Sequence, residues 1–284
     1  MKTLSTTNRF QFTRITMLST FFFLALLVTG PAAANVFNVN TTSDTHAVDP
    51  FDGTGLDASG NISLRSALET ADALGGTHAV NLPAGLYLLT EGEIYMGTGA
   101  QDITIQGAGA ATTIISMDEG INQDRILFIN YTGTTADVHT MIDGIKFMNG
   151  HLNSDPFGGG AIRAGGPDNI LTVTNCVFDN NTLDQFNGGT TGGAINVSGG
   201  GALTISSCTF TNNINPVSDG GAVYYFLQNF PGLTGSISIS NCTFSGNSAT
   251  SDGGGSGGAI GFAAQGGDKR TELLCFHSKK YFPE

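Results

Sequence analysis

Short runs of alternating apolar and polar residues recur between residues 158 and 260, and two motifs mark each recurrence. The first motif is Gly-Gly-Ala followed by Ile or Val, at residues 159–162, 192–195, 220–223 and 257–260. The second is an alternating run that ends in an aromatic residue, at Phe147, Phe178, Phe210 and Phe244. Alternation with a period of two predicts half-buried strands. Self-similarity at a period of 31 to 34 residues predicts stacked supersecondary units.

Within each repeat, the apolar positions switch from odd-numbered to even-numbered residues. Leu171 and Val173 share one face of a strand, whereas Cys176 and Phe178 have the opposite parity. A straight strand cannot bury both pairs. We therefore expect a bend at residues 174–175, and at the equivalent residues 206–207 and 240–241. A second tight turn is expected three residues after each Phe, where Asn is tolerated, at Asn181, Asn213 and Asn247.

These features predict an all-β chain folded as a right-handed parallel β-helix. A single repeat cannot bury its apolar face, but stacked repeats form a continuous core. Equivalent side chains should then lie over one another at about 4.8 Å, the spacing of neighbouring strands. The predicted structural ladder consists of Phe147, Phe178, Phe210 and Phe244, of Cys176, Cys208 and Cys242, and of Asn181, Asn213 and Asn247. A Greek-key sandwich is the alternative, but it gives no reason for identical residues at this period.

The cysteines are expected to be buried thiols. Three equivalent residues cannot all pair, and a free Cys packs as a small apolar group. A disulfide between neighbours remains geometrically open.

The chain divides into four parts. Residues 1–34 have a basic leader, an apolar run of twelve residues and an Ala-Ala-Ala segment, which predicts a removable export signal. Residues 35–77 are expected to form an N-terminal cap that contains a short helix from about Ser63 to Leu74, with Ser63 as N-cap and Gly75-Gly76 at its end. Residues 78–267 are the predicted β-helix. Residues 268–284 lack glycine and the repeat. They are expected to be a non-native or degenerate tail on a truncated β-helix, with a short C-terminal cap as the alternative.

The motifs resemble the repeats of bacterial polymorphic outer membrane proteins, in which Gly-Gly-Ala-Ile pairs with Phe-x-x-Asn. The segment at residues 62–67 also resembles a Cys-Ser-Leu-Arg-Glu-Ala signature that precedes such β-helices, although its Cys and Glu are replaced. This resemblance implies a surface or passenger protein, exported to the outer membrane surface or the extracellular space. No integral membrane span is expected in the mature chain.

A carbohydrate-active enzyme is the competing function, because pectate lyases and polygalacturonases share the expected fold. No Lys, Arg, His or Glu occurs between Ala164 and Asp268, so the best-formed repeats lack a cationic base. Asp143 and Asp179 are the carboxylates to consider, but the residues in register with Asp179 are Thr211 and Ser245. We therefore assign no catalytic residue and favour a role without enzymatic activity, with a carbohydrate-active enzyme as the alternative.

The composition limits the classes of partner and cofactor that the chain is expected to bind. The formal net charge of −12 argues against nucleic acid and anionic membrane surfaces. No cofactor or zinc site is expected. Ca²⁺ stays open as an alternative because several loops carry Asp, although none has a full set of ligands.

An insert at residues 224–235 is longer than the matching stretch in the other repeats. It contains Tyr224, Tyr225, Phe226 and Phe230, which would be exposed if it loops out. We expect it to contact a host or matrix surface or a glycan, with packing on the flank of the solenoid as the alternative. The predicted role is adhesion or structural display.

Overall fold

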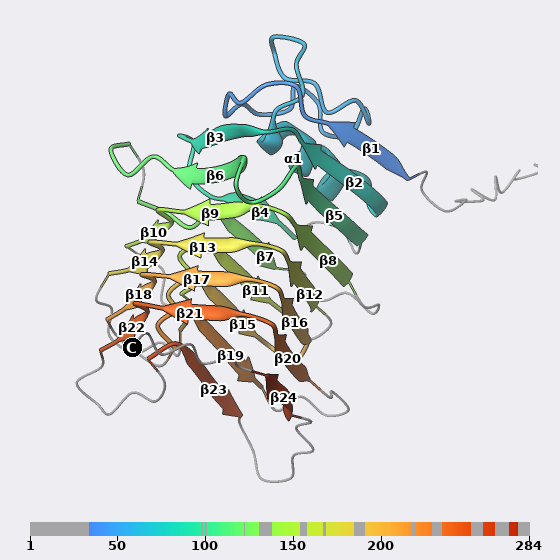
Figure 1. Ribbon diagram of the computed structural model, residues 1–284. Coiled ribbons are helices and arrows are strands. Elements are labelled where there is room, and N and C mark those ends of the chain that lie inside the picture. Colours follow the sequence, from blue (N-terminus) through green and yellow to red (C-terminus); the bar gives the residue numbers. More distant parts are fainter. Residues whose placement is uncertain are drawn as a thin grey trace, which may run out of the picture. The chain divides into compact units, whose positions relative to one another are not determined.

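A computed structural model describes residues 34–97, 99, 101–121, 123–130, 138–153, 158–166, 169–184, 191–216, 220–228, 235–250, 258–264 and 273–277. In this part of the chain, strands pair in parallel between successive coils to form four sheets (Figure 1). In Figure 1 the chain runs from the top to the bottom of the solenoid, and the strands at the front point to the left. This combination of directions makes the coil right-handed. The predicted parallel β-helix is confirmed. Residues 1–33 of the predicted export signal lie outside the described residues.

Four sheets contribute strands to the coils in the order 1, 2, 3, 4. Sheet 1 consists, in spatial order, of β1 (Asn35–Asn38), β2 (Gly76–Leu82), β5 (Gln101–Gly107), β8 (Val138–Asp143), β12 (Asn169–Thr174), β16 (Ala202–Ser206), β20 (Ser236–Ser240) and β24 (Leu273–His277). Sheet 2 consists of β3 (Gly85–Leu89), β6 (Thr113–Met117), β9 (Lys146–Met148), β13 (Val177–Asp179), β17 (Thr209–Thr211) and β21 (Thr243–Ser245).

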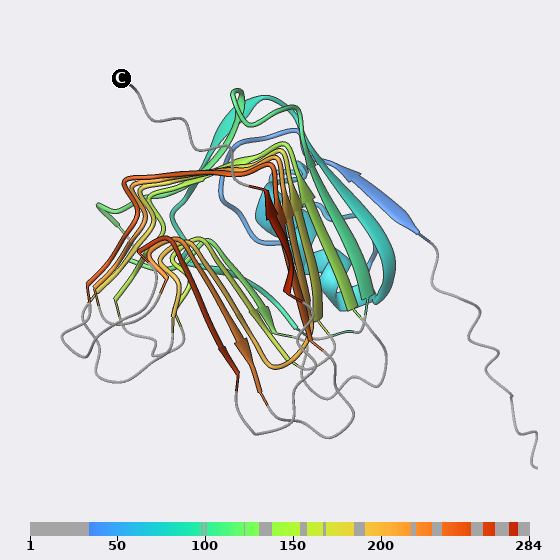
Figure 2. The same ribbon diagram turned by 60° about the horizontal axis from the view of Figure 1, so that its bottom comes forward.

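The other two sheets close each coil. Sheet 3 is confined to the later coils and consists of β10 (His151–Leu152), β14 (Thr182–Leu183), β18 (Ile214–Asn215) and β22 (Ser248–Ala249). Sheet 4 consists of β4 (Ile94–Met96), β7 (Leu127–Asn130), β11 (Ile162–Gly165), β15 (Ile195–Ser198), β19 (Val223–Leu227) and β23 (Ile260–Ala264). The traces of the repeats superpose when the structure is viewed with its last coil forward (Figure 2).

The helix α1 (Leu64–Leu74) covers the first coil. The side chain of Ser63 accepts a hydrogen bond from the main-chain N–H of Ser66, whose own side chain accepts one from the N–H of Ser63. The helix ends at Gly75, which has a φ of 65° that favours glycine. Its apolar stripe is buried against β2 and β4. The predicted boundaries and capping position are confirmed, and the helix shields an apolar cross-section that would otherwise face water.

The first bend of each repeat lies where parity predicts it. Asn175, Ser207 and Asn241 have φ values of 52°, 54° and 52°. This left-handed conformation turns the chain from sheet 1 to sheet 2. Leu171, Val173 and Phe178 can therefore all face the same core.

The second turn differs from the prediction by one residue. The left-handed residues are Asn180 and Asn212, each with φ of 55°, and Gly246 with φ of 67°. The asparagines that follow them, which we expected to form the turn, point inward instead. The reason is that the turn rotates the next side chain into the interior, where it finds hydrogen-bond partners in neighbouring coils.

The Gly-Gly-Ala motif is explained by close backbone approach. A Cβ atom at Gly193 would lie 2.1 Å from the carbonyl oxygen of Gly221, and one at Gly221 would lie 2.2 Å from that of Gly258. The main chain of this segment also forms hydrogen bonds directly between coils, since the N–H of Gly221 donates to the carbonyl oxygen of Gly258 at 3.1 Å. Any side chain here would push the coils apart.

One described strand, β24, lies within the residues expected to form the non-repeat tail. Strand β24 pairs in parallel with β20, with a register shift between Ser238 and Ser240. Part of residues 268–284 therefore extends sheet 1, although its sequence lacks the repeat. Main-chain pairing needs no particular side chains, so an irregular segment can occupy the edge of a regular sheet.

Candidate functional site

The aromatic insert is not an exposed loop at its start. Tyr224 and Tyr225 have no exposed surface, because β19 continues the in-register pairing of sheet 4 to Leu227. Tyr225 faces the core, donates a hydrogen bond to the oxygen of Gly201 at 2.6 Å, and stacks on Phe262. The expected contact role is therefore wrong for these two tyrosines. Phe226 is partly exposed, and Phe230 lies outside the described residues.

The predicted ladder of phenylalanines is present. Phe147, Phe178, Phe210 and Phe244 form one column with ring-centroid separations of 5.2, 4.8 and 4.8 Å and interplanar angles of 9°, 6° and 4°. Parallel pairing in register imposes this stacking, since each Phe has its repeat equivalent as its neighbour.

The cysteine column is made of free thiols, as expected. Cys176 and Cys208 are buried and Cys242 is partly buried. The main-chain N–H of Cys176 donates to Sγ of Cys208 at 3.4 Å, and that of Cys208 to Sγ of Cys242 at 3.5 Å. The contact with Cys176, together with burial, raises the pKa of Cys208 to about 12. The Cys208 thiol therefore stays protonated at neutral pH, and the column packs as part of the core.

The asparagine column is a buried hydrogen-bonded ladder. Oδ1 of Asn213 accepts from the main-chain N–H of Asn181 at 3.1 Å and from its Nδ2 at 2.9 Å. Nδ2 of Asn213 donates to the oxygen of Phe178 at 3.0 Å and to Oδ1 of Asn247 at 2.8 Å. The Asn213 amide thus links three coils. The sequence reveals the repeat of Asn but not its use, because a turn residue and an inward ladder residue look alike.

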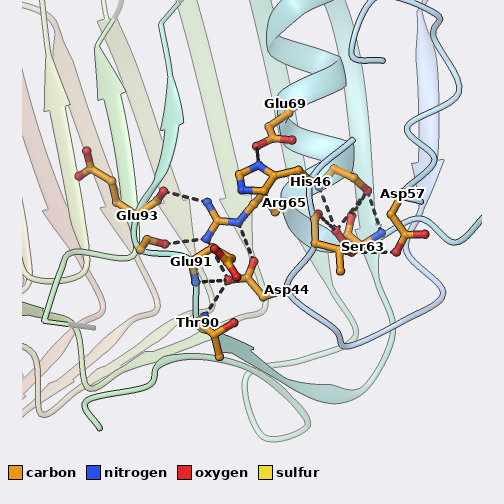
Figure 3. Close-up of polar contacts among 12 residues, drawn as sticks. Asp44, His46, Asp57, Ser63, Arg65, Glu69, Thr90, Glu91 and Glu93 are labelled. Carbon is orange, nitrogen blue, oxygen red and sulfur yellow. Dashed lines mark hydrogen bonds and ion pairs between the residues drawn. The ribbon is translucent and has the colours of Figure 1, made fainter. Parts of the chain in front are cut away.

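A buried ion pair fastens the N-terminal cap to the first coil (Figure 3). Nε of Arg65 lies 2.7 Å from Oδ1 of Asp44, and its Nη atoms donate to the carbonyl oxygens of Gly92 and Glu93. Asp44 also accepts from the N–H groups of Thr90 and Glu91. Burial alone would raise the pKa of Asp44, but these hydrogen bonds and the Arg65 charge lower it. These contacts clamp the cap to the first coil.

The two carboxylates considered for catalysis act as links between coils. Asp143 accepts hydrogen bonds from Gln106, Thr174 and Asn175, each at 2.6 Å. Burial favours a higher pKa for Asp143, but the three donors outweigh it and lower the pKa. A general acid needs a raised pKa instead.

Asp179 is held in the same way. Its carboxylate lies 2.9 Å from Nζ of Lys146 and accepts from Oγ1 of Thr211 at 2.7 Å. Burial would raise the pKa of Asp179, but the Lys146 and Thr211 contacts lower it below its usual value. Neither carboxylate is therefore poised to donate a proton.

Outward positions of sheets 1 and 2 form aligned columns of hydroxyl groups in the later coils. In sheet 1, Thr172, Thr204 and Ser238 are in register, as are Thr174, Ser206 and Ser240. In sheet 2, the columns continue with Thr209 over Thr243 and Thr211 over Ser245. These columns, with the adjoining corner residues, are called the hydroxyl face below. Its Thr and Ser residues are uncharged and partly to fully exposed, and the carboxylates of Asp143 and Asp179 lie in register at its edge.

Sequence reasoning missed two features of the surface. The hydroxyl face went unnoticed because single Thr and Ser residues are common in strands, although their period matches that of Phe. An open cleft of about 380 Å³ also lies beside the cap, between residues 39–42 and residues 83–87, with Tyr87 in its lining. The hydroxyl of Tyr87 is already engaged, since it donates to the oxygen of Pro83 at 2.9 Å.

Comparison with known proteins identifies no relative: no family model, curated protein or solved structure matches the chain. Among the described residues, no group of three or more His, Cys, Asp or Glu side chains is arranged to hold a metal ion. No described helix has the length and apolar character needed to cross a bilayer. Function must therefore be argued from the surface of the solenoid.

Proposed function

We propose that the protein is an exported rod that displays an adhesive surface, and that the hydroxyl face binds a neutral glycan of a host or matrix surface. The observation that supports this is the register of Thr and Ser along sheets 1 and 2. Regularly spaced hydroxyl groups offer donors and acceptors to sugar hydroxyls. The absence of charge there suits a neutral ligand better than a uronate.

The finer assignment to the polymorphic outer membrane protein type belongs to the same proposal. It is supported by the Gly-Gly-Ala-Ile and Phe-x-x-Asn motifs, which correspond to structural needs of the coil. It implies export to the outer membrane surface or the extracellular space, and no cofactor. Exposed loops and rigid faces are the usual places for binding on such a scaffold.

The test is binding of the purified protein to immobilised neutral and acidic glycans and to matrix proteins, with and without Ca²⁺. We expect binding to a neutral glycan that Thr209→Asp weakens at least about tenfold, because an unpaired carboxylate is placed on the face. The control is Leu86→Asp, an exposed position in the same sheet near the cap. Equal loss for both variants would contradict the proposed site.

The same preparations should be assayed for cleavage of polygalacturonate and neutral glycans. Turnover that disappears in Asp143→Asn or Asp179→Asn would establish the carbohydrate-active enzyme instead. Stability of these variants is measured alongside, because both carboxylates link coils.

A further inference from the structure

The last described coil leaves the interior of the solenoid incompletely covered. Phe178 and Phe210 have no exposed surface, whereas Phe244, Cys242 and Ile260 are only partly buried and Phe262 is 37% exposed. These residues belong to the last described coil, the end of the solenoid that comes forward in Figure 2. Apolar groups at the end of a stack gain from being covered by another apolar surface.

Main-chain pairing between the described strands also stops at this end of the solenoid. Among the described strands, sheets 2, 3 and 4 finish with β21, β22 and β23, and only sheet 1 continues, with β24. In the ladders, the N–H groups of Cys208 and Asn213 donate to side chains of the next coil. The equivalent groups of Cys242 and Asn247 have no such acceptor in the described part of the chain. Strand edges of this kind are templates for pairing with another chain.

The opposite end of the solenoid is closed. Helix α1 packs on β2 and β4, and its apolar residues Leu64, Ala67 and Leu68 are at most 2% exposed. A head-to-tail contact would require the open end of one molecule to meet this helix. Two open ends can meet only around a twofold axis, which gives a closed dimer and no filament.

Charge and size also fit a second copy. Residues 235–250 and 258–264 of the last coil contain no Asp, Glu, Lys, Arg or His, and β24, which continues sheet 1 at this end, contains only His277 among these residue types. Two such ends can therefore approach without local repulsion, even though the chain carries a formal charge of −12. Their extent is comparable to the roughly 20–30 residues a side of a standard interface.

We propose that two copies of this chain associate through these last coils. The twofold axis makes the facing strands antiparallel, so main-chain groups of β21 and β23 can pair across the interface. Phe244 and Phe262 of the two copies become covered. The dimer then presents two hydroxyl faces on one rod of about doubled length, although the proposal does not depend on what those faces bind.

The experiment is sedimentation analysis of the full chain between roughly 1 and 100 μM, a range that detects micromolar affinity. We expect a concentration-dependent dimer. Phe244→Lys and Phe262→Lys should each weaken dimerisation at least about tenfold, because a charge is buried twice in a symmetric interface. If Phe244→Lys fails to fold, Phe262→Lys tests the interface instead, because Phe262 is at a more exposed position.

The matched control is Thr243→Lys, which adds the same charge to the same strand but on the outward side of sheet 2. It should leave the dimer unchanged. A protein that is monomeric throughout, or one whose dimer resists both Phe substitutions, overturns the proposal. A monomer that becomes a dimer when residues 278–284, which follow β24, are deleted would show that the chain's own end covers this surface, which also overturns the proposal.

Discussion

The cap with the early coils and the later coils are held together by different interactions. The early region relies on charged pairs: Arg65 with Asp44, and Arg125 with Glu93 at 2.5 Å. Arg125 and Arg163 also lie over the ring of Phe128, at 4.7 and 5.3 Å. The later coils, apart from the Lys146–Asp179 pair at their start, rely on neutral ladders of Phe, Cys and Asn.

The difference follows from the geometry of stacking. In an in-register parallel stack, the neighbour of each side chain is its own repeat equivalent. A charge repeated in every coil would lie about 4.8 Å from an identical charge, which costs about 3 kcal/mol per pair at an effective dielectric constant of about 20. The cap is not repetitive, so opposite charges can meet there. The scarcity of Lys, Arg, His and Glu in the repeats is consistent with this cost of stacking like charges.

The largest effect should come from the middle of the phenylalanine column. We expect Phe178→Ala to lower the free energy of unfolding by about 3–5 kcal/mol, because it creates a cavity and removes stacking on both faces. Phe244→Ala should cost about half as much, since its ring stacks on one Phe in the described chain. Denaturant unfolding measures both.

Phe178→Leu and Phe244→Leu are the matched controls, because they keep most of the apolar volume. Equal costs at the two positions would show that the end coil is as well packed as the middle.

The next effect concerns the buried ion pair of the cap. Arg65→Met should destabilise the protein by about 3 kcal/mol, because it leaves the Asp44 carboxylate buried without its charged partner. The double variant Arg65→Met, Asp44→Asn should recover part of this loss. Hydrogen exchange should show the increased opening in α1 and β2, with the later coils still protected. Uniform loss of protection would contradict independent stabilisation of the two regions.

A smaller effect is expected in the asparagine ladder. Asn213→Ala removes an amide that donates twice and accepts twice, and leaves buried groups of Asn181 and Phe178 without partners. We expect a loss of about 2 kcal/mol. Asn212→Ala serves as the comparison, since it tests the strain of a left-handed residue with φ of 55° and leaves the ladder intact. Thermal unfolding of both variants separates the two contributions.

The smallest expected effect is a loss of folding stability as the pH falls into the acidic range. The pKa values of Asp143 and Asp179 are lowered in the folded protein, so the folded state binds fewer protons than the unfolded state near pH 4. Their contribution is complete above the unfolded pKa of about 3.9 and is lost as pH falls through the folded pKa.

Each partly exposed carboxylate should contribute less than about 1 kcal/mol. Unfolding midpoints measured from neutral pH to about pH 2.5 should fall less steeply in Asp143→Asn, Asp179→Asn than in the unchanged protein. An identical slope would remove the role of these carboxylates as links.

Several elements could be predicted from residues alone because their signals are local or periodic. Ser63 and Gly75 mark the ends of α1, and the parity change between Val173 and Cys176 requires a bend. The period of Phe fixes the register of the coils. The candidate binding surface was predicted less well. Rare aromatic residues are conspicuous in a sequence, whereas Thr and Ser are common in strands, so their repeat is easily overlooked.

The sequence by itself determined the parallel stacking, the order of the coils and the capping helix, because each depends on spacing along the chain. Only the tertiary structure decided that Asn213 points inward while Asn212 makes the turn, and that Tyr224 and Tyr225 are covered. These outcomes depend on what the neighbouring coil offers to a side chain. That neighbour is about 32 residues away in sequence and directly adjacent in space.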